Sequence, residues 1–324
     1  MDLRNGAEVT SYLIRKGVMA PGTRATLVPL TGGVSSEVVL VRNGRSLVLK
    51  RALAKLRVKE DWYAGTERNQ VEAECLRRVS ALAPDFVPEL VLEDRDASLF
   101  AMEYVDGPTW KAELLAGRMD FFVPEQLGRF LGALHRSSYK NPAWLAPFES
   151  KALFYQLRVS PYFVFIRPRY AAWTEALDFV IDGLMSRSEV LVHGDFSPKN
   201  VLLRQGQPCV LDWEVAHAGH PAFDVGFLLS HLLLKAIHFG VNGQACHQAA
   251  QVFYDTYFRE VQVLPEPEYR PMVMRTTGAL MLARVDGKSP VEYLTPSEQE
   301  VARRGGIALL TGEVDHLQDF QWMG

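Results

Sequence analysis

Residues 191–214 read LVHGDFSPKNVLLRQGQPCVLDWE, and this stretch decides the fold that we predict. Three of its side chains, those of Asp195, Asn200 and Asp212, are of the types that serve metal-assisted phosphoryl transfer. An Asp can orient and deprotonate an attacking hydroxyl. An Asn and a second Asp supply the oxygen ligands that Mg²⁺ prefers. The stretch therefore indicates a kinase.

The spacing of apolar runs around these residues predicts a loop followed by a hairpin. Residues 190–192, 201–203 and 209–211 are short apolar runs that can be buried as strands. Gly194 permits a backbone conformation that most residues avoid, and Pro198 stops a helix from continuing through the loop. We expect this arrangement to bring the three polar side chains to one end of neighbouring strands.

The same stretch resembles the catalytic loop and metal-binding segment of the aminoglycoside phosphotransferase and choline kinase family, which carries the motif HGDxxxxN. This resemblance implies that Asp195 is the catalytic base and that Asn200 and Asp212 are Mg²⁺ ligands. It also implies an α+β, protein-kinase-like fold of two lobes, one small and β-rich, the other larger and mainly helical. We expect residues 1–105 to form the nucleotide-binding lobe with the hinge, and residues 106–324 the helical lobe with the catalytic loop and the acceptor site.

The sequence disfavours two alternatives to a small-molecule kinase. A protein kinase is disfavoured because the chain has neither an HRD loop nor an Asp-Phe-Gly segment, and Asp212 is followed by Trp213-Glu214. A catalytically silent nucleotide-binding protein of the same fold is disfavoured because Lys50 and the three polar residues of the motif are all present. The predicted reaction moves the γ-phosphoryl group of ATP to a hydroxyl of an aminoglycoside, an amino alcohol or a sugar-like metabolite; GTP in place of ATP is left open.

A glycine-containing loop between two expected strands is the candidate phosphate-binding loop. Backbone N–H groups of such a loop can lie over phosphates, which makes Gly33 and Ser35 candidate nucleotide contacts. Asn43-Gly44 is a hairpin signal, and the return strand ends at Lys50. A lysine there can contact phosphates when a Glu of the following helix holds it. Glu72 and Glu74 are both available, and the resemblance favours Glu72.

An apolar strand over residues 97–104 leads into the expected linker between the lobes. In the family the backbone of this hinge hydrogen-bonds the adenine edge, which implies main-chain contacts from Glu103 and Val105. Further along the chain, Asp224 precedes an apolar helix. In the kinase-like fold an acid at this place braces the catalytic loop by accepting backbone N–H bonds, and we expect that role here.

The acceptor is not identified by the sequence. Acidic side chains would suit an aminoglycoside, aromatic ones a choline-like substrate, and Arg and Lys a phosphorylated or carboxylate acceptor. A charged interruption between late helices, residues 284–290, adds to the candidates near the metal segment. The acceptor candidates are Glu214, His217, Arg284, Asp286 and Lys288.

Composition narrows the class of protein. Of the 324 residues 48% are hydrophobic and 23% charged, with a formal net charge of −3, so we expect no nucleic-acid or membrane partner. Three scattered cysteines predict reduced, buried thiols and a cytoplasmic protein. Residues 223–239 come closest to a membrane span but contain charged residues. A monomer or a homodimer fits the length equally well.

Overall fold

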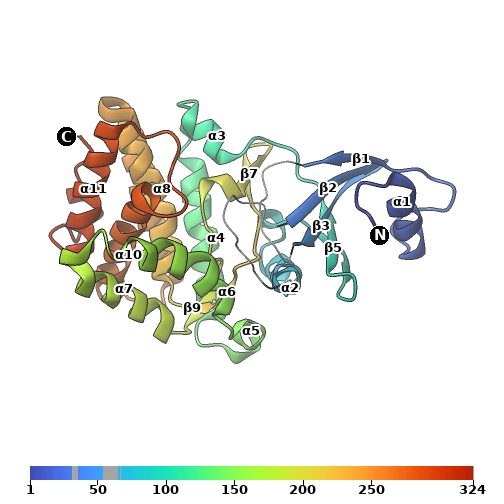
Figure 1. The fold of residues 1–324 in the computed structure, drawn as a ribbon, viewed down its shortest axis with the longest axis horizontal. Helices are drawn as coiled ribbons and strands as arrows, with labels where there is room; N and C mark the ends of the chain where they lie inside the picture. Colours follow the sequence, from blue (N-terminus) through green and yellow to red (C-terminus); the bar gives the residue numbers. More distant parts are fainter. Residues whose placement is uncertain (31–35, 54–64, 66, 324) are drawn as a thin grey trace. The chain divides into compact units, whose positions relative to one another are not determined.

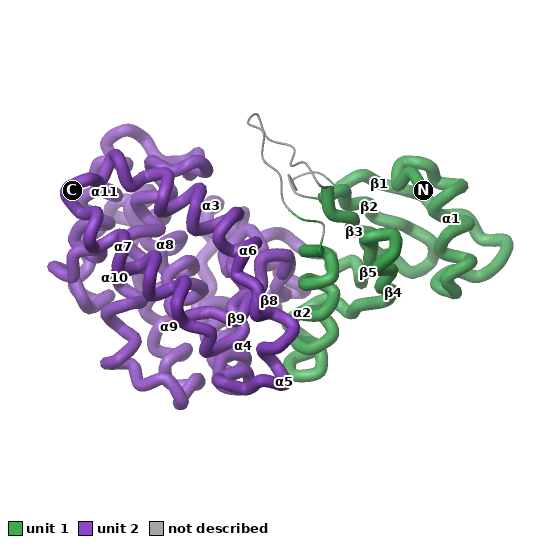
Figure 2. The backbone as a smooth tube through the Cα atoms, turned by 60° about the horizontal axis from the view of Figure 1, so that its bottom comes forward, with its two compact units in different colours: residues 1–106 green, residues 107–324 purple. Residues whose placement is uncertain are grey.

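The computed structural model of the chain describes residues 1–30, 36–53, 65 and 67–323. The chain divides into two compact units, residues 1–106 and residues 107–324 (Figure 2). Unit 1 holds a five-stranded sheet, and unit 2 is mostly helical with two small two-stranded sheets (Figure 1). The expected α+β fold, with a small β-rich part and a larger helical part, is confirmed.

The sheet of unit 1 has the strand order β1-β2-β3-β5-β4, and every neighbouring pair is antiparallel. The first helix packs against this sheet with its apolar side. Helix α1 begins at Gly6, because the side chain of Asn5 accepts hydrogen bonds from the amides of Ala7 and Glu8 and caps the helix. The elements of unit 1 are α1 (Gly6–Arg15), β1 (Thr26–Pro29), β2 (Ser36–Asn43), β3 (Arg45–Ala52), α2 (Arg68–Leu82), η1 (Pro84–Phe86), β4 (Leu90–Asp94) and β5 (Leu99–Glu103).

The hairpin predicted at Asn43-Gly44 is confirmed. Asn43 pairs with Arg45, and Gly44 between them has φ of 69°, which a glycine adopts without strain. Strand β4 was missed by the sequence analysis. All of its residues are half-buried, so it lacks the alternation of buried and exposed side chains that identifies a strand.

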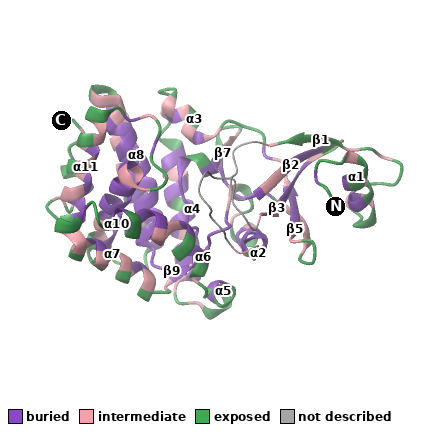
Figure 3. Cartoon of the chain, viewed as in Figure 1, coloured by how far each residue is buried: buried purple, intermediate pink, exposed green. Residues whose placement is uncertain are grey.

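Unit 2 is built around α8, which lies in the interior of the helical layer (Figure 3). Residues 222–237 of this helix are all buried. The elements are α3 (Trp110–Leu115), α4 (Phe122–Ser138), α5 (Pro142–Leu145), η2 (Ala146–Phe148), α6 (Ala152–Phe154), η3 (Tyr155–Val164), η4 (Ala171–Trp173), α7 (Thr174–Ser186), β6 (Val190–Val192), η5 (Pro198–Asn200), β7 (Val201–Arg204), β8 (Gln207–Val210), β9 (His217–Gly219), α8 (Ala222–Phe239), η6 (Gly240–Gly243), α9 (Gln244–Val261), α10 (Glu266–Asp286), α11 (Pro296–Thr311) and η7 (Leu317–Asp319).

The stretch Ala222–Val261, which contains α8 and α9, is long and apolar enough by length and composition to cross a membrane. Within its most apolar window 89% of the residues are buried inside the protein. Core helices of globular proteins have this combination of apolar sequence and burial.

Two differences from the sequence analysis affect the site. Strand β6 does not join the predicted hairpin of β7 and β8; it pairs with β9, a strand that the sequence did not reveal. Residues 284–286 do not interrupt the late helices either, since α10 continues to Asp286. Arg284 and Asp286 therefore lie on the last turn of a helix.

Candidate active site

The catalytic loop is fixed to the beginning of α8 by the carboxylate of Asp224. This buried side chain accepts hydrogen bonds from the backbone amides of His193 at 2.6 Å and Gly194 at 2.9 Å. The brace expected from the resemblance is confirmed. Gly194 has φ of 80°, and a Cβ there would lie 2.6 Å from the carbonyl oxygen of Val215. The loop therefore requires glycine at this position, both for its backbone conformation and for space.

The ring of His193 joins the catalytic loop to the strand that precedes Asp212. The Nδ1 atom accepts the amide of Asp195 at 3.0 Å, so the proton of the neutral ring lies on Nε2, which donates to the carbonyl of Leu211 at 3.0 Å. Burial lowers the pKa of His193, which keeps the ring neutral. One imidazole thus fixes the backbone on both sides of the candidate site.

Asn200 and Asp212 come together at the ends of the β7–β8 hairpin. The side-chain amide of Asn200 donates to the carbonyl of Asp195 at 3.0 Å, and the carbonyl of Asn200 accepts the amide of Leu211 at 2.8 Å. Asp212 has φ of 67°, in the left-handed region that non-glycine residues seldom adopt. Such strain concentrates at functional sites. An amide oxygen and a carboxylate in this arrangement are hard donors of the kind that Mg²⁺ binds.

The carboxylate of Asp195 is buried, and its two oxygens differ. Oδ2 forms ion pairs with Nζ of Lys199 at 2.9 Å and with Nη2 of Arg158 at 3.0 Å. Oδ1 is buried and has no hydrogen-bond partner among the described residues. Burial alone would raise the pKa of Asp195, but Lys199 and Arg158 outweigh it and lower the pKa below its usual value. The site thus contains an ionised carboxylate with one oxygen available.

Arg158 was missed by the sequence analysis. It lies on η3, a π-helix, and its Nε donates to the carbonyl of Gly194 at 2.7 Å. A single arginine 37 positions before Asp195 gives no local signal. Pro161 within the helical stretch was the one available sign of irregular structure, since π-helices are frequent at functional sites.

Within unit 1, Lys50 is paired with Glu72. Their side chains are buried, and Lys50 Nζ lies 2.6 Å from Glu72 Oε2. Glu74 instead pairs with Arg77 and Arg78 on its own helix. The Asn69 side chain donates to the carbonyl of Lys50 at 3.2 Å and joins α2 to the sheet.

The remaining predicted nucleotide contacts lie in or near unit 1. Glu103 is the last residue of β5, and Val105 follows it as a buried residue. Gly33 and Ser35 lie outside the described residues.

The predicted acceptor residues come from β9, the last turn of α10 and the segments beside these elements. His217 is stacked on Phe154 with ring centroids 4.0 Å apart, and burial lowers its pKa to about 4. Asp286 is held by Tyr170 Oη at 2.6 Å, Arg303 Nε at 2.9 Å and Arg169 Nη1 at 3.1 Å. His217 is therefore held by packing against an aromatic ring, and Asp286 by a hydrogen bond and two ion pairs.

Three acceptor candidates remain. Glu214 is buried two residues after Asp212. Arg284 is half-buried and donates to the side chain of Ser289 at 2.9 Å. Lys288 is exposed, with its Nζ 5.5 Å from the ring of Phe165.

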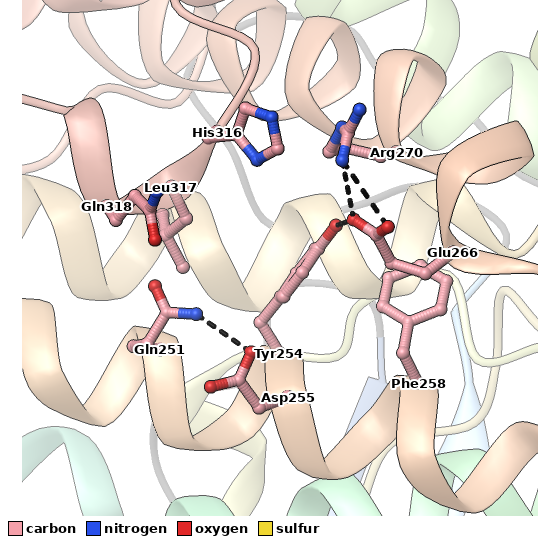
Figure 4. A pocket seen from close by; sticks show the side chains of 9 residues that line it. All are labelled: Gln251, Tyr254, Asp255, Phe258, Glu266, Arg270, His316, Leu317 and Gln318. Atoms are coloured by element: carbon pink, nitrogen blue, oxygen red, sulfur yellow. Dashed lines mark hydrogen bonds and ion pairs between the residues drawn. The ribbon is translucent and has the colours of Figure 1, made fainter.

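A separate pocket in unit 2 lies between α9, the beginning of α10 and the C-terminal segment (Figure 4). Its volume is about 290 Å³. The side chain of Glu266 lines the pocket. It accepts a hydrogen bond from Tyr254 Oη at 2.6 Å and forms an ion pair with Arg270. None of the residues predicted to take part in phosphoryl transfer lines it.

Comparison with solved structures gives the same fold with low sequence identity. A choline kinase from Cryptosporidium parvum Iowa II superposes with a TM-score of 0.57 and 12% identity over 95% of this chain and 96% of that one. A choline kinase from Streptococcus pneumoniae gives 0.54 and 13%, over 94% and 99%. An amicoumacin kinase, solved with AMP-PNP and Ca²⁺, gives 0.56 and 14%, over 98% of both chains.

Curated relatives have a higher sequence identity to this chain, but the alignments cover only part of their length. Methylthioribose kinase 2 of Oryza sativa subsp. japonica is 27% identical over 66% of this chain and 57% of its own length. The methylthioribose kinase of Pectobacterium atrosepticum is 26% identical over 68% of this chain and 62% of its own. The chain thus spans about three fifths of the length of these relatives. The model of the phosphotransferase enzyme family matches residues 26–259, and the chain belongs to this family.

Proposed function

We propose that this chain is an ATP-dependent phosphotransferase that moves the γ-phosphoryl group to a hydroxyl of a small molecule. One observation carries the proposal: Asp195 keeps a buried, unpartnered Oδ1 on a loop whose backbone is fixed by Asp224 and His193. A carboxylate oxygen held in this way can accept a hydrogen bond from an attacking hydroxyl. Membership in the phosphotransferase enzyme family supports the same chemistry.

Asp195 acts mainly by orientation. Because Lys199 and Arg158 lower the pKa of Asp195, the carboxylate is ionised at neutral pH and its oxygen is a hydrogen-bond acceptor. The same two cations make it a weak base. Because a weak base cannot deprotonate the free hydroxyl, Asp195 accepts the proton only as the hydroxyl oxygen bonds to phosphorus. This timing suits a reaction in which catalysis depends mostly on positioning.

Asn200 and Asp212 are the residues that would hold Mg²⁺. When bound, Mg²⁺ neutralises charge on the transferring phosphates. The chain's own contribution is to hold the two donors still: Asn200 is fixed by its bond to the Asp195 carbonyl, and Asp212 by the left-handed turn after Leu211. Lys199, which pairs with Asp195, adds a positive charge on the same loop.

Unit 1 is proposed to bind the nucleotide. The buried ion pair of Lys50 and Glu72 supports this role, because a carboxylate fixes the position of an ammonium group that can attract phosphates. Main-chain atoms of Glu103 and Val105 would contact the base. Gly33 and Ser35 would contact phosphates. GTP is the alternative nucleotide for the assay.

The acceptor is proposed to be a small metabolite, since the relatives are named for methylthioribose and structural neighbours for choline. Neither molecule is assigned to this chain. Cys75, Cys209 and Cys246 are buried as reduced thiols, which supports a reducing, cytoplasmic location. No nucleic-acid or membrane partner is proposed, and a monomer and a homodimer fit equally.

The test is acceptor-dependent ADP release with and without Mg²⁺, together with a separate measurement of nucleotide binding. The proposal expects ADP release that requires a hydroxyl acceptor and stops when EDTA removes Mg²⁺. Nucleotide binding without ADP release under any condition would identify a silent nucleotide-binding protein. Absence of both would reject the proposal.

A further inference from the structure

A group of basic and aromatic side chains lies along α8 and the end of α10. Lys235 is fully buried on α8, and its ammonium group lies 5.2 Å from the ring centroid of Tyr293. The ammonium group donates a hydrogen bond to the carbonyl of His231, one helical turn back, at 3.3 Å. We call the group the α8 cluster; its members are His231, Lys235, Arg284 and Tyr293.

The cluster has basic side chains without a matching carboxylate, although burial lowers the pKa of Lys235 to about 7. No carboxylate pairs with Lys235 or Arg284 among the residues that the structure describes. Burial lowers the pKa of His231, and Arg284 and Lys235 lower it further, which places their charges near this ring. The carboxylate of Glu292, which also acts on Lys235, is paired with Lys111.

Several polar atoms of the cluster have no partner. The hydroxyl of Tyr293 and the Nε of Arg284 are buried and make no hydrogen bond to any described residue. An ammonium group has three N–H donors, and Lys235 has one bond of 3.3 Å. Buried polar and charged groups normally have partners, because leaving them unpaired costs free energy. The cluster thus has donors that no described residue satisfies and that an anion could use.

The cluster is linked to Asp195 by a short series of ring contacts. The guanidinium of Arg158, which pairs with Asp195, lies 6.0 Å from the centroid of Tyr162. Tyr162 stacks on Phe227 at 6.0 Å, and Phe227 lies 5.3 Å from His231.

Helix α8 connects the cluster to the residue that holds the catalytic loop. Asp224, which holds that loop, precedes His231 by seven residues on α8, or about 10 Å along the helix axis. The side chain of Lys235 also points back toward this end of the helix, as its bond to the His231 carbonyl requires. The cluster therefore begins about two turns of α8 beyond the residue that holds the catalytic loop.

We propose that the α8 cluster binds the acceptor and that the acceptor carries a carboxylate or a phosphate group beside its hydroxyl. The proposal rests on the phosphotransferase function proposed above. The anionic group would accept hydrogen bonds from Lys235, Arg284 and Tyr293, while Asp195 receives the hydroxyl. A cationic acceptor such as an aminoglycoside or choline is disfavoured at this place by repulsion from the same side chains.

The experiment compares acceptors matched in size that differ in charge. ADP release is measured with gluconate, glucose and glucosamine, and with ribose 5-phosphate, ribose and methylthioribose. The expected result is a higher kcat/KM for gluconate or ribose 5-phosphate than for their neutral and cationic counterparts. Preference for gluconate or for the phosphate ester distinguishes a carboxylate acceptor from a phosphorylated one. Equal or higher kcat/KM for the neutral or cationic compounds would overturn the proposal.

Three variants connect the preference to the cluster. Lys235→Met and Arg284→Gln should each raise KM for the anionic acceptor by about 10- to 100-fold, the size of a hydrogen bond to a charged group. Lys140→Met, which removes a positive charge at an exposed position, is the matched control and should leave KM unchanged. Unchanged selectivity in Lys235→Met and Arg284→Gln would overturn the proposal.

Two readouts keep folding and function apart. Lys235→Met should unfold at a higher temperature than the wild type, because it replaces a buried, unpaired ammonium by an apolar side chain of similar length. If no compound drives ADP release, the thermal unfolding temperature is measured in saturating AMP-PNP with and without gluconate or ribose 5-phosphate, to test for anion binding alone. Stabilisation of the wild type but not Lys235→Met by gluconate or ribose 5-phosphate would support the anion site while rejecting phosphoryl transfer. No stabilisation of either would reject both.

Discussion

Arg158 lies 3.0 Å from Asp195 and holds one of its two carboxylate oxygens. The same guanidinium donates from Nε to the carbonyl of Gly194, so it is bonded to the catalytic loop at two points. Lys199 shares the oxygen that Arg158 holds, and the other oxygen stays without a partner among the described residues. This asymmetry orients the carboxylate and leaves one oxygen for the acceptor.

Removing Arg158 should therefore slow the reaction more than it weakens nucleotide binding. We expect Arg158→Met to lower kcat by about 100-fold, the cost of a misplaced reacting group, with little change in KM for ATP. Steady-state kinetics at saturating acceptor is the measurement. Arg167→Met, which removes an arginine paired with Asp178 on the molecular surface, is the matched control. Equal kcat values for Arg158→Met and the wild type would contradict the role assigned to Arg158.

The Lys50–Glu72 pair gives a second prediction with a built-in control. Glu72→Gln leaves a buried lysine without its carboxylate, which should destabilise unit 1 by about 3–5 kcal/mol and raise KM for ATP. Glu74→Gln, two residues further along the same helix, removes a carboxylate that pairs with Arg77 and Arg78, and should change KM little. Nucleotide titration and urea unfolding of both variants are the measurements. A larger change in KM for ATP in Glu74→Gln than in Glu72→Gln would show that Glu72 is not the functional partner of Lys50.

Buried histidines predict how stability depends on pH. Burial lowers the pKa of His217 to about 4 and that of His220 to about 3, against about 6.5 in the unfolded chain. Below pH 6.5 the unfolded state therefore binds more protons than the folded state, so stability falls as pH falls. Each histidine contributes a slope of about 1.4 kcal/mol per pH unit between roughly pH 6 and pH 4.

Urea unfolding at pH 8, 6, 5 and 4 measures this slope. His217→Phe keeps an aromatic ring against Phe154 and removes one titrating group, so its slope should be lower by about one proton. The pH 8 value separates any packing loss from the proton effect. An identical slope in the variant and the wild type would show that His217 does not titrate on unfolding.

The local part of the site could be predicted from sequence, because adjacent residues make it. The HGDxxxxN spacing and two apolar runs correctly place Asp195, Asn200 and Asp212 around one hairpin. The choice of Glu72 over Glu74 as the partner of Lys50 followed from the resemblance, and the ion pair is present. The Asp224 brace followed from the resemblance, and its two hydrogen bonds are present.

Contacts between distant segments could not be predicted in this way. Arg158 reaches Asp195 from a π-helix with no motif, and strand β9 is three residues long, too short for a periodic signal. Lys235 lies in an apolar helix, where sequence alone suggests a lysine that reaches solvent, and its complete burial depends on α8 lying in the core. Long-range packing decides each of these positions.

Transfer of label from γ-³²P ATP to an acceptor hydroxyl tests the central claim most directly. The wild type should transfer one phosphoryl group for each ADP released. Asp195→Asn, which keeps the size of the side chain but lacks the ionised carboxylate, should bind nucleotide as the wild type does and transfer label at least about 1,000-fold more slowly. Label transfer by Asp195→Asn at the wild-type rate would contradict the account.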